Sequence, residues 1–95
     1  MSDETQLLEG ARLGIDAESF ARSKFGKFLI EKAETEMAAA TDELVDADPD
    51  DAKANRDLRN QIHVARMLLT WLHEAVNVGK QCHQELQEME DLSPH

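Results

Sequence analysis

Apolar side chains recur every three or four residues along the second half of the chain. The positions of this stripe are Leu58, Ile62, Ala65, Leu69, Leu72, Val76, Gly79, His83 and Leu86. Alternating steps of four and three are the spacing of helices that pack side by side as coiled coils. The pattern therefore predicts one long helix, which we place over residues 49–92, ending before Pro94.

A cluster of aspartates around one proline marks the start of this helix. Asp48 is a suitable N-cap, Pro49 is tolerated at the first helical position, and the carboxylates of Asp50 and Asp51 favour the positive end of the helix dipole. Together with Asp46, these residues are predicted to form a hairpin turn and an acidic patch. Their spacing departs from that of a calcium-binding loop and lacks its glycine, so we interpret the charges as solvated helix ends.

The segment before this turn has a matching helical pattern. Its apolar positions are Phe20, Phe25, Phe28, Leu29, Ile30, Ala33, Met37, Ala40, Leu44 and Ala47. This spacing predicts a helix over residues 17–47, which the turn folds back against residues 49–92 as an antiparallel helical hairpin. The alanines would let the two backbones approach closely.

The N-terminal residues predict a further, shorter helix over residues 3–13. Asp3 and Glu4 suit its first turn, and Gly14 is a suitable residue for its C-terminal end. Asp16 can then cap the next helix. The fold class that follows is all-α, as a single helical domain over residues 1–95.

A second apolar line runs along the long helix and predicts an interface. Its members are Val64, Met67, Leu68, Trp71 and Val78. One hairpin partner can cover only one side of a helix, so this line needs another cover. Either the short N-terminal helix covers it in a monomeric three-helix bundle, or the chain self-associates into a four-helix or larger bundle. Trp71 is accordingly either an interface anchor or a core residue.

Charge and composition narrow the classes of function. The formal net charge is -10, which disfavours direct binding to nucleic acid or to an anionic lipid surface. The N-terminus has no basic segment followed by an apolar run, and no stretch has the roughly 20 apolar residues that a membrane span needs. These features predict a cytoplasmic protein that does not associate with membranes.

Residues that carry chemistry are few, and their spacing is unsuited to a joint site. His63, His73 and His83 follow at intervals of ten, which places successive side chains about 80° apart around a helix. Cys82 is the only cysteine, and a lone helical cysteine is usually a packing residue. No phosphate-binding glycine motif or zinc-ligand spacing is present. We therefore expect no catalytic residues, no metal site and no cofactor.

Three segments resemble small helical proteins encoded by tailed bacteriophages and prophages. The segments are G-I-D-A-E-S-F at 14–20, A-D-P-D-D-A-K-A at 47–54 and R-D-L-R-N-Q-I at 56–62, within a similarity covering roughly residues 7–84. The resemblance implies an origin among phage genes, often near those for the head and its packaging machinery. It supplies no catalytic or binding residue to transfer.

Two functional hypotheses follow. The first is a non-enzymatic structural, assembly or protein-interaction protein, whose partners are further copies of itself and an unidentified protein such as a phage structural component. It would act in the cytoplasm of the bacterial host or in association with the virion. The alternative is an acidic inhibitor that mimics DNA and occupies the basic groove of a host DNA-binding protein.

Overall fold

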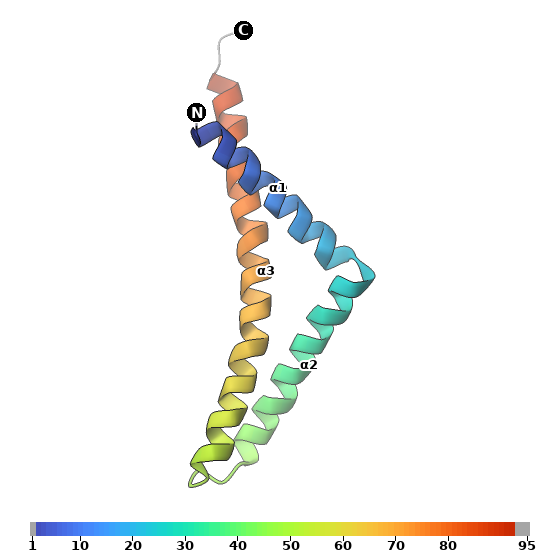
Figure 1. The fold of residues 1–95 in the computed structure, drawn as a ribbon, viewed down its shortest axis with the longest axis vertical. Helices are drawn as coiled ribbons and strands as arrows, with labels where there is room; N and C mark the ends of the chain where they lie inside the picture. Colours follow the sequence, from blue (N-terminus) through green and yellow to red (C-terminus); the bar gives the residue numbers. More distant parts are fainter. Residues whose placement is uncertain (1, 93–95) are drawn as a thin grey trace. The chain divides into compact units, whose positions relative to one another are not determined.

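The computed structural model describes residues 2–92 and contains three α-helices in this range. They are α1 (Ser2–Arg22), α2 (Lys24–Asp46) and α3 (Ala52–Leu92) (Figure 1). No strand occurs among the described residues, so the predicted all-α class is confirmed. The predicted long helix is also confirmed as α3, which has 41 residues; Pro94, predicted to follow its end, lies outside the described residues.

The chain divides into two compact units. The hairpin unit consists of Lys24–Trp71, which contains α2 and the first half of α3. The terminal unit consists of Met1–Ser23 together with Leu72–His95, and contains α1 and the second half of α3. Within each unit, two helices pack against each other along one side.

The first helix is longer than the sequence predicted, and the expected loop at residues 14–16 is wrong. Gly14 lies inside α1 and is buried, because the backbone of α3 approaches it at Gly79. A Cβ atom added at Gly14 would overlap the Cα of Gly79 and would lie 3.2 Å from its nitrogen. Gly14 therefore permits a close helix crossing instead of ending a helix, and Asp16 is an exposed residue within α1.

The first helix ends at Arg22, and Ser23 lies at the break between α1 and α2. The Ser23 backbone N–H donates to the carbonyl oxygens of Ser19 and Phe20 at 3.1 and 3.0 Å. Its side-chain hydroxyl also donates to the Phe20 carbonyl at 2.6 Å. A serine hydroxyl that competes for helical carbonyls in this way favours a local departure from the helix. The helix predicted over residues 17–47 is thus divided, and α2 begins only at Lys24.

The third helix begins three residues later than predicted. The Asp51 carboxylate accepts the backbone N–H of Ala54 at 3.1 Å, which is the geometry of an N-cap. The Asp48 carboxylate instead accepts the N–H of Asp50 at 2.9 Å within the turn. Asp51, and not Asp48, is therefore the cap, and α3 starts at Ala52.

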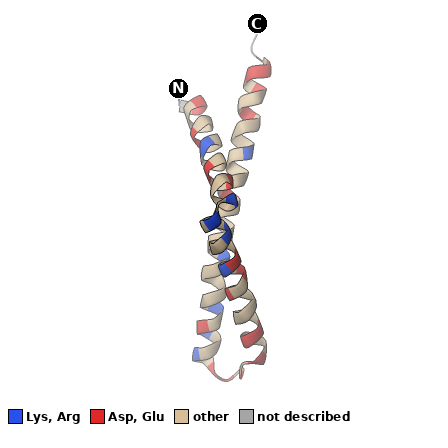
Figure 2. Ribbon diagram, turned by 90° about the vertical axis from the view of Figure 1, so that its right-hand side faces the viewer, with Lys and Arg blue, Asp and Glu red and all other residues tan. Residues whose placement is uncertain are grey.

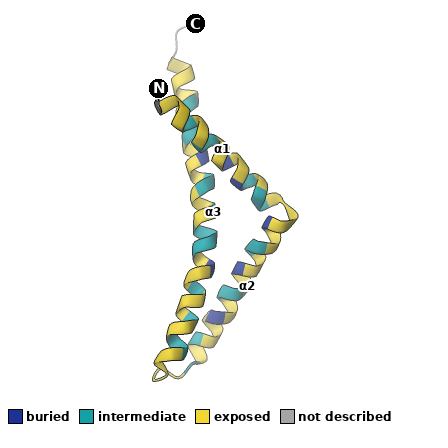
Figure 3. Cartoon of the chain, in the orientation of Figure 1, coloured by how far each residue is buried: buried dark blue, intermediate teal, exposed yellow. Residues whose placement is uncertain are grey.

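The residues buried between the paired helices are small. The buried apolar side chains are Ala17, Ala33, Ala40 and Ala65. Figure 3 shows the buried positions of the chain in dark blue, as isolated sites on helices that are otherwise half-buried or exposed. Gly26, Ala33 and Ala40 are the buried residues of α2 and are spaced by seven; Ala33 and Ala40 belong to the predicted helical pattern.

Two large apolar residues of the predicted helical pattern lie at the surface of α2. Phe25 and Phe28 are 62% and 56% exposed, and their rings stack on each other with centroids 6.4 Å apart. The seam with α3 passes through Gly26 and Ala33. Because side chains are spread around a helix, Phe25 and Phe28 point away from this seam. Phe25 and Phe28 therefore lie outside the seam between α2 and α3.

Candidate interaction site

An apolar groove runs between α2 and α3 within the hairpin unit. It has a volume of about 570 Å³. Its lining residues are Leu29, Lys32, Ala33, Glu36, Gln61, Val64, Ala65, Leu68 and Trp71. Trp71 is 60% exposed and Val64 is 62% exposed, so the largest side chains of the groove remain accessible to a partner.

Three polar side chains close the groove on the side of the hairpin turn. The Gln61 side-chain amide donates to the Glu36 carboxylate at 2.9 Å, and this bond links α3 to α2. The same carboxylate lies 3.5 Å from the Lys32 ammonium group. The groove is therefore polar at one end and apolar at the other, which gives it a direction.

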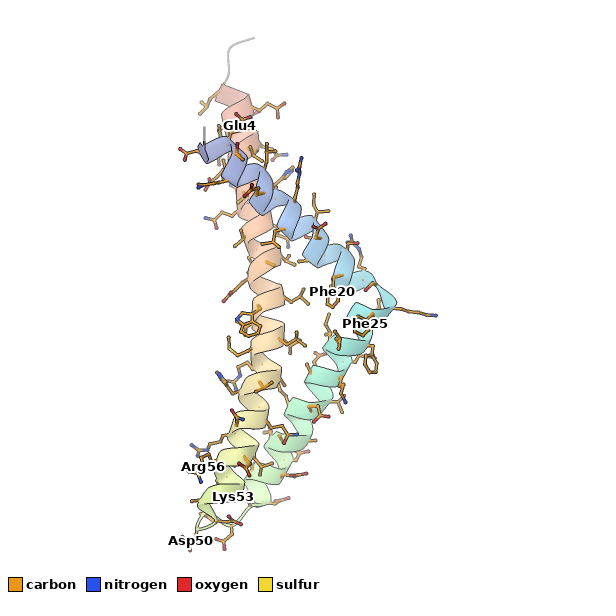
Figure 4. All side chains as sticks on the ribbon, in the orientation of Figure 1. Glu4, Phe20, Phe25, Asp50, Lys53 and Arg56 are labelled. Atoms are coloured by element: carbon orange, nitrogen blue, oxygen red, sulfur yellow. The ribbon has the colours of Figure 1, made fainter. Side chains whose placement is uncertain are left out.

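The stacked phenylalanines extend the apolar end of the groove. Phe25, Phe28 and Lys32 follow one another at helical intervals of three and four residues, so they lie along one side of α2. Lys32 lines the groove, and this side of α2 is therefore continuous with its wall. Figure 4 shows Phe25 at the start of α2.

The structure brings three of the five predicted interface residues together. Val64, Leu68 and Trp71 line the groove, and the exposure of Trp71 places it outside the core of this chain. Met67 belongs to the same unit and is half-buried but does not line the groove. Val78 lies in the terminal unit, where a Cβ atom added at Gly10 would meet the side chains of Cys82 and Val78.

The contribution of α2 to this groove was not predicted from the sequence. Leu29, which lines the groove, was predicted only as an apolar position of a helix, as were Phe25 and Phe28 beside it. The usable signal was the run of alanines at intervals of seven, since Ala33 and Ala40 fix the seam and leave the larger side chains beside it.

The predicted acidic turn is a compact hydrogen-bonded loop. Asp46 ends α2, and Asp48 and Asp51 use their carboxylates to bind backbone N–H groups. The Asn55 side-chain amide donates to the carbonyl oxygens of Asp48 and Asp51, at 2.8 Å each. Figure 4 shows Asp50 in this loop and Lys53 in the adjoining first turn of α3. These bonds give the aspartates a structural role.

The terminal unit offers smaller or more polar surfaces. A groove of about 300 Å³ in this unit includes the charged side chains of Glu18 and Lys80 together with His83. Among residues 2–92, no three His, Cys, Asp or Glu side chains come together as a group that could hold a metal ion. None of the helices described has both the length and the apolar character that crossing a bilayer requires.

Comparison with known proteins adds no relative. No protein-family model matches the chain, and neither the curated proteins nor the solved structures compared with it give a match. The interpretation of the groove therefore depends on its own geometry and chemistry.

Proposed function

We propose that this chain is a non-enzymatic assembly protein that acts by binding further copies of itself through the apolar groove of the hairpin unit. In this proposal the bacteriophage resemblance gives the setting, so that the assembled helices join a phage structural component in the host cytoplasm or in the virion.

The exposure of large apolar side chains is the main support for this proposal. Each unit is a pair of helices, and a pair shares only one face, which here buries alanines and glycines. Val64 and Trp71 remain more than half exposed on one flank. Contiguous apolar patches of this kind typically mark protein interaction sites. An exposed tryptophan beside aliphatic side chains is also the usual composition of an interface centre.

The distribution of charge favours this proposal over mimicry of DNA. Figure 2 shows Lys and Arg residues interspersed with Asp and Glu along the helices. Several of these charges are paired along one helix, as between Arg22 and Glu18 at 3.9 Å and between Lys53 and Asp57 at 3.2 Å. A mimic of the DNA backbone would need regular rows of uncompensated negative charge.

The proposal is tested by the absolute mass of the protein in solution. Size-exclusion chromatography with light scattering over a tenfold range of concentration should give a dimer or larger species. Trp71→Asp places a carboxylate in the groove and should return the mass to about 10.7 kDa. Val45→Asp is the matched control, because Val45 is 76% exposed in the same unit and does not line the groove.

Circular dichroism separates loss of assembly from loss of folding. Both variants should keep the helical signal of the parent protein, because neither side chain is buried. If Trp71→Asp loses helicity, Val64→Asp gives the same test at a second exposed groove position. A parent protein that is a stable monomer over the whole range contradicts the proposed function.

A further inference from the structure

We infer that a second copy of this chain docks on the groove in the antiparallel orientation, so that the two hairpin units overlap around Leu29 and Leu68 and their acidic turns point away from each other. This inference rests on the proposed function and adds the partner's surface and its orientation. It follows from the levels of the groove residues along the helices, from the charge of the turn and from the area available.

The hydrogen bond across the groove fixes which residues of the two helices lie at the same level. Glu36 and Gln61 are bonded to each other at 2.9 Å. The two helices are antiparallel. The residue seven positions before Glu36 on α2 therefore lies at the same height along the helix pair as the residue seven positions after Gln61 on α3. These positions are Leu29 and Leu68, which both line the groove. They lie at the middle of its apolar part.

A two-fold axis through the level of Leu29 and Leu68 gives complementary contacts in the antiparallel orientation. Trp71 lies three residues from Leu68 in one direction, and Val64 lies four residues from it in the other. At 1.5 Å per residue, these positions are about 4.5 and 6 Å from the axis. Antiparallel docking therefore sets Trp71 of each copy against Val64 of the other.

In the same antiparallel arrangement, Lys32 of one copy lies near the phenylalanines of the other. Phe25 lies four residues from Leu29, away from the turn, and Lys32 lies three residues from it, toward the turn. Antiparallel docking therefore brings Lys32 of each copy to the level of the Phe25 and Phe28 pair of the other. A lysine can lay its aliphatic stem on such rings and direct its ammonium group to their faces.

The acidic turn disfavours the parallel orientation. Residues 42–51 contain six Asp and Glu residues and no Lys or Arg. Parallel docking would place two such segments side by side, and the nearby Lys53 and Arg56 offset only part of this charge. Like charges within a Debye length of about 8 Å repel one another at physiological ionic strength. Antiparallel docking separates the two turns.

The groove and the neighbouring phenylalanines together offer enough apolar surface for a specific pairing. Trp71, Phe25 and Phe28 are 56–62% exposed, and an aromatic side chain offers roughly 200 Å², so the three leave roughly 350 Å² per copy. With Val64 and the two leucines, two copies can bury about 1,000 Å² in total, which meets the lower bound for a specific interface.

The orientation is measured by one spin label per chain. Asp46→Cys in a Cys82→Ser background places a single reactive thiol at the end of α2. Asp46 is seventeen residues from Leu29, which is about 25 Å along the helix. In an antiparallel dimer the two labels lie on opposite sides of the two-fold axis, each about 25 Å from it. Pulsed electron paramagnetic resonance should therefore find them about 50 Å apart. In a parallel dimer the labels would share one level, no more than about two helix diameters, or roughly 25 Å, from each other.

A second label position tests the same orientation by a change in distance. Glu43→Cys in the Cys82→Ser background lies three residues nearer the groove than Asp46 and is also exposed. In an antiparallel dimer both labels move toward the axis, so the distance should shorten by about 9 Å. In a parallel dimer both labels move in the same direction along the bundle, and the distance along its axis stays at zero.

The outcomes separate this inference from the proposed function. A labelled protein that has the mass of a dimer and gives the long distance supports antiparallel docking. A dimer that gives the short distance at both label positions overturns the antiparallel orientation and leaves self-association in place. A labelled protein that is monomeric, when its Cys82→Ser parent is also monomeric, overturns both.

Discussion

The close crossing of α1 and α3 makes a prediction about three glycines that differ in what a methyl group would meet. A Cβ atom at Gly14 would overlap the backbone of Gly79, and one at Gly79 would overlap Gly14 in return. A Cβ atom at Gly10 would instead overlap the sulfur of Cys82, which lies at the end of a side chain that can rotate. The same Gly→Ala change should therefore have different costs at positions four residues apart.

The magnitudes follow from two opposing effects. Alanine stabilises a helix by about 1 kcal/mol relative to glycine. Forcing an extra methyl group into a close-packed contact costs about 1–3 kcal/mol. For Gly14→Ala and Gly79→Ala the backbones must separate, and we expect a net loss of about 1 kcal/mol. For Gly10→Ala, moving the Cys82 side chain costs about 0.5–1.5 kcal/mol, so the net change should be near zero.

The assay is urea unfolding followed by circular dichroism, with all proteins at one concentration because the stability of an assembling protein depends on concentration. The combined Gly14→Ala and Gly79→Ala variant should lose less than the sum of the single losses, since one separation of the helices accommodates both methyl groups. A Gly14→Ala protein that is as stable as the Gly10→Ala protein would refute the close crossing of the two backbones.

Three further predictions concern the turn and the groove. Asp51→Ala should lower the free energy of unfolding by about 1 kcal/mol in a thermal melt, because the Ala54 N–H loses its acceptor. Asp50→Ala is the control, since it keeps the carboxylates of Asp48 and Asp51, and equal losses in the two variants would contradict the role of Asp51 as N-cap. Added salt should strengthen self-association in light scattering, because it screens the repulsion between copies that each carry -10; weaker association would indicate a contact driven by charge. Trp71 fluorescence should shift to shorter wavelength as concentration rises, because docking removes water from its exposed ring, and a shift that does not follow the mass would place the interface elsewhere.

The helical pattern of the sequence was sufficient to predict the fold class and the seam. Ala33 and Ala40 are buried seven residues apart on α2, Ala65 is a buried member of the predicted stripe of the long helix, and α3 extends to Leu92, as predicted from the position of Pro94. These features depend on periodicity within one helix, which the sequence records directly.

The helix ends were less predictable, because one residue type can serve two purposes. Glycine is common at helix ends, but it also allows a second helix to pack closely. Which of the two applies to Gly14 depends on Gly79, which is 65 positions away in the sequence. At the break, the Ser23 hydroxyl bonds back to a carbonyl, but Thr41 makes a similar bond to the Met37 carbonyl inside the unbroken α2, so this residue type does not by itself predict a break. Several consecutive aspartates likewise compete to cap α3, and only geometry selects Asp51.

Only one of the two walls of the candidate site could be predicted from the sequence. Val64, Leu68 and Trp71 share one line on one helix, so their grouping could be found by spacing alone. The second wall of the groove comes from another helix, and its position depends on how the two helices are rotated about their axes. That rotation is set by which small residues meet at the seam, and the sequence alone leaves several choices open.

The alanine seam has a consequence for how the protein responds to temperature. The heat capacity change of unfolding is set mainly by the apolar surface that unfolding exposes, and about 1.2 kcal/mol/K is usual for a domain of this size. A chain whose buried side chains are alanines hides little apolar surface, so an isolated copy should show a smaller value and a broad melting transition. Its stability should then change little between cold and warm conditions. Sharp, cooperative melting would be acquired only when copies join, and calorimetry at increasing concentration would show it as a steepening of the heat absorption peak.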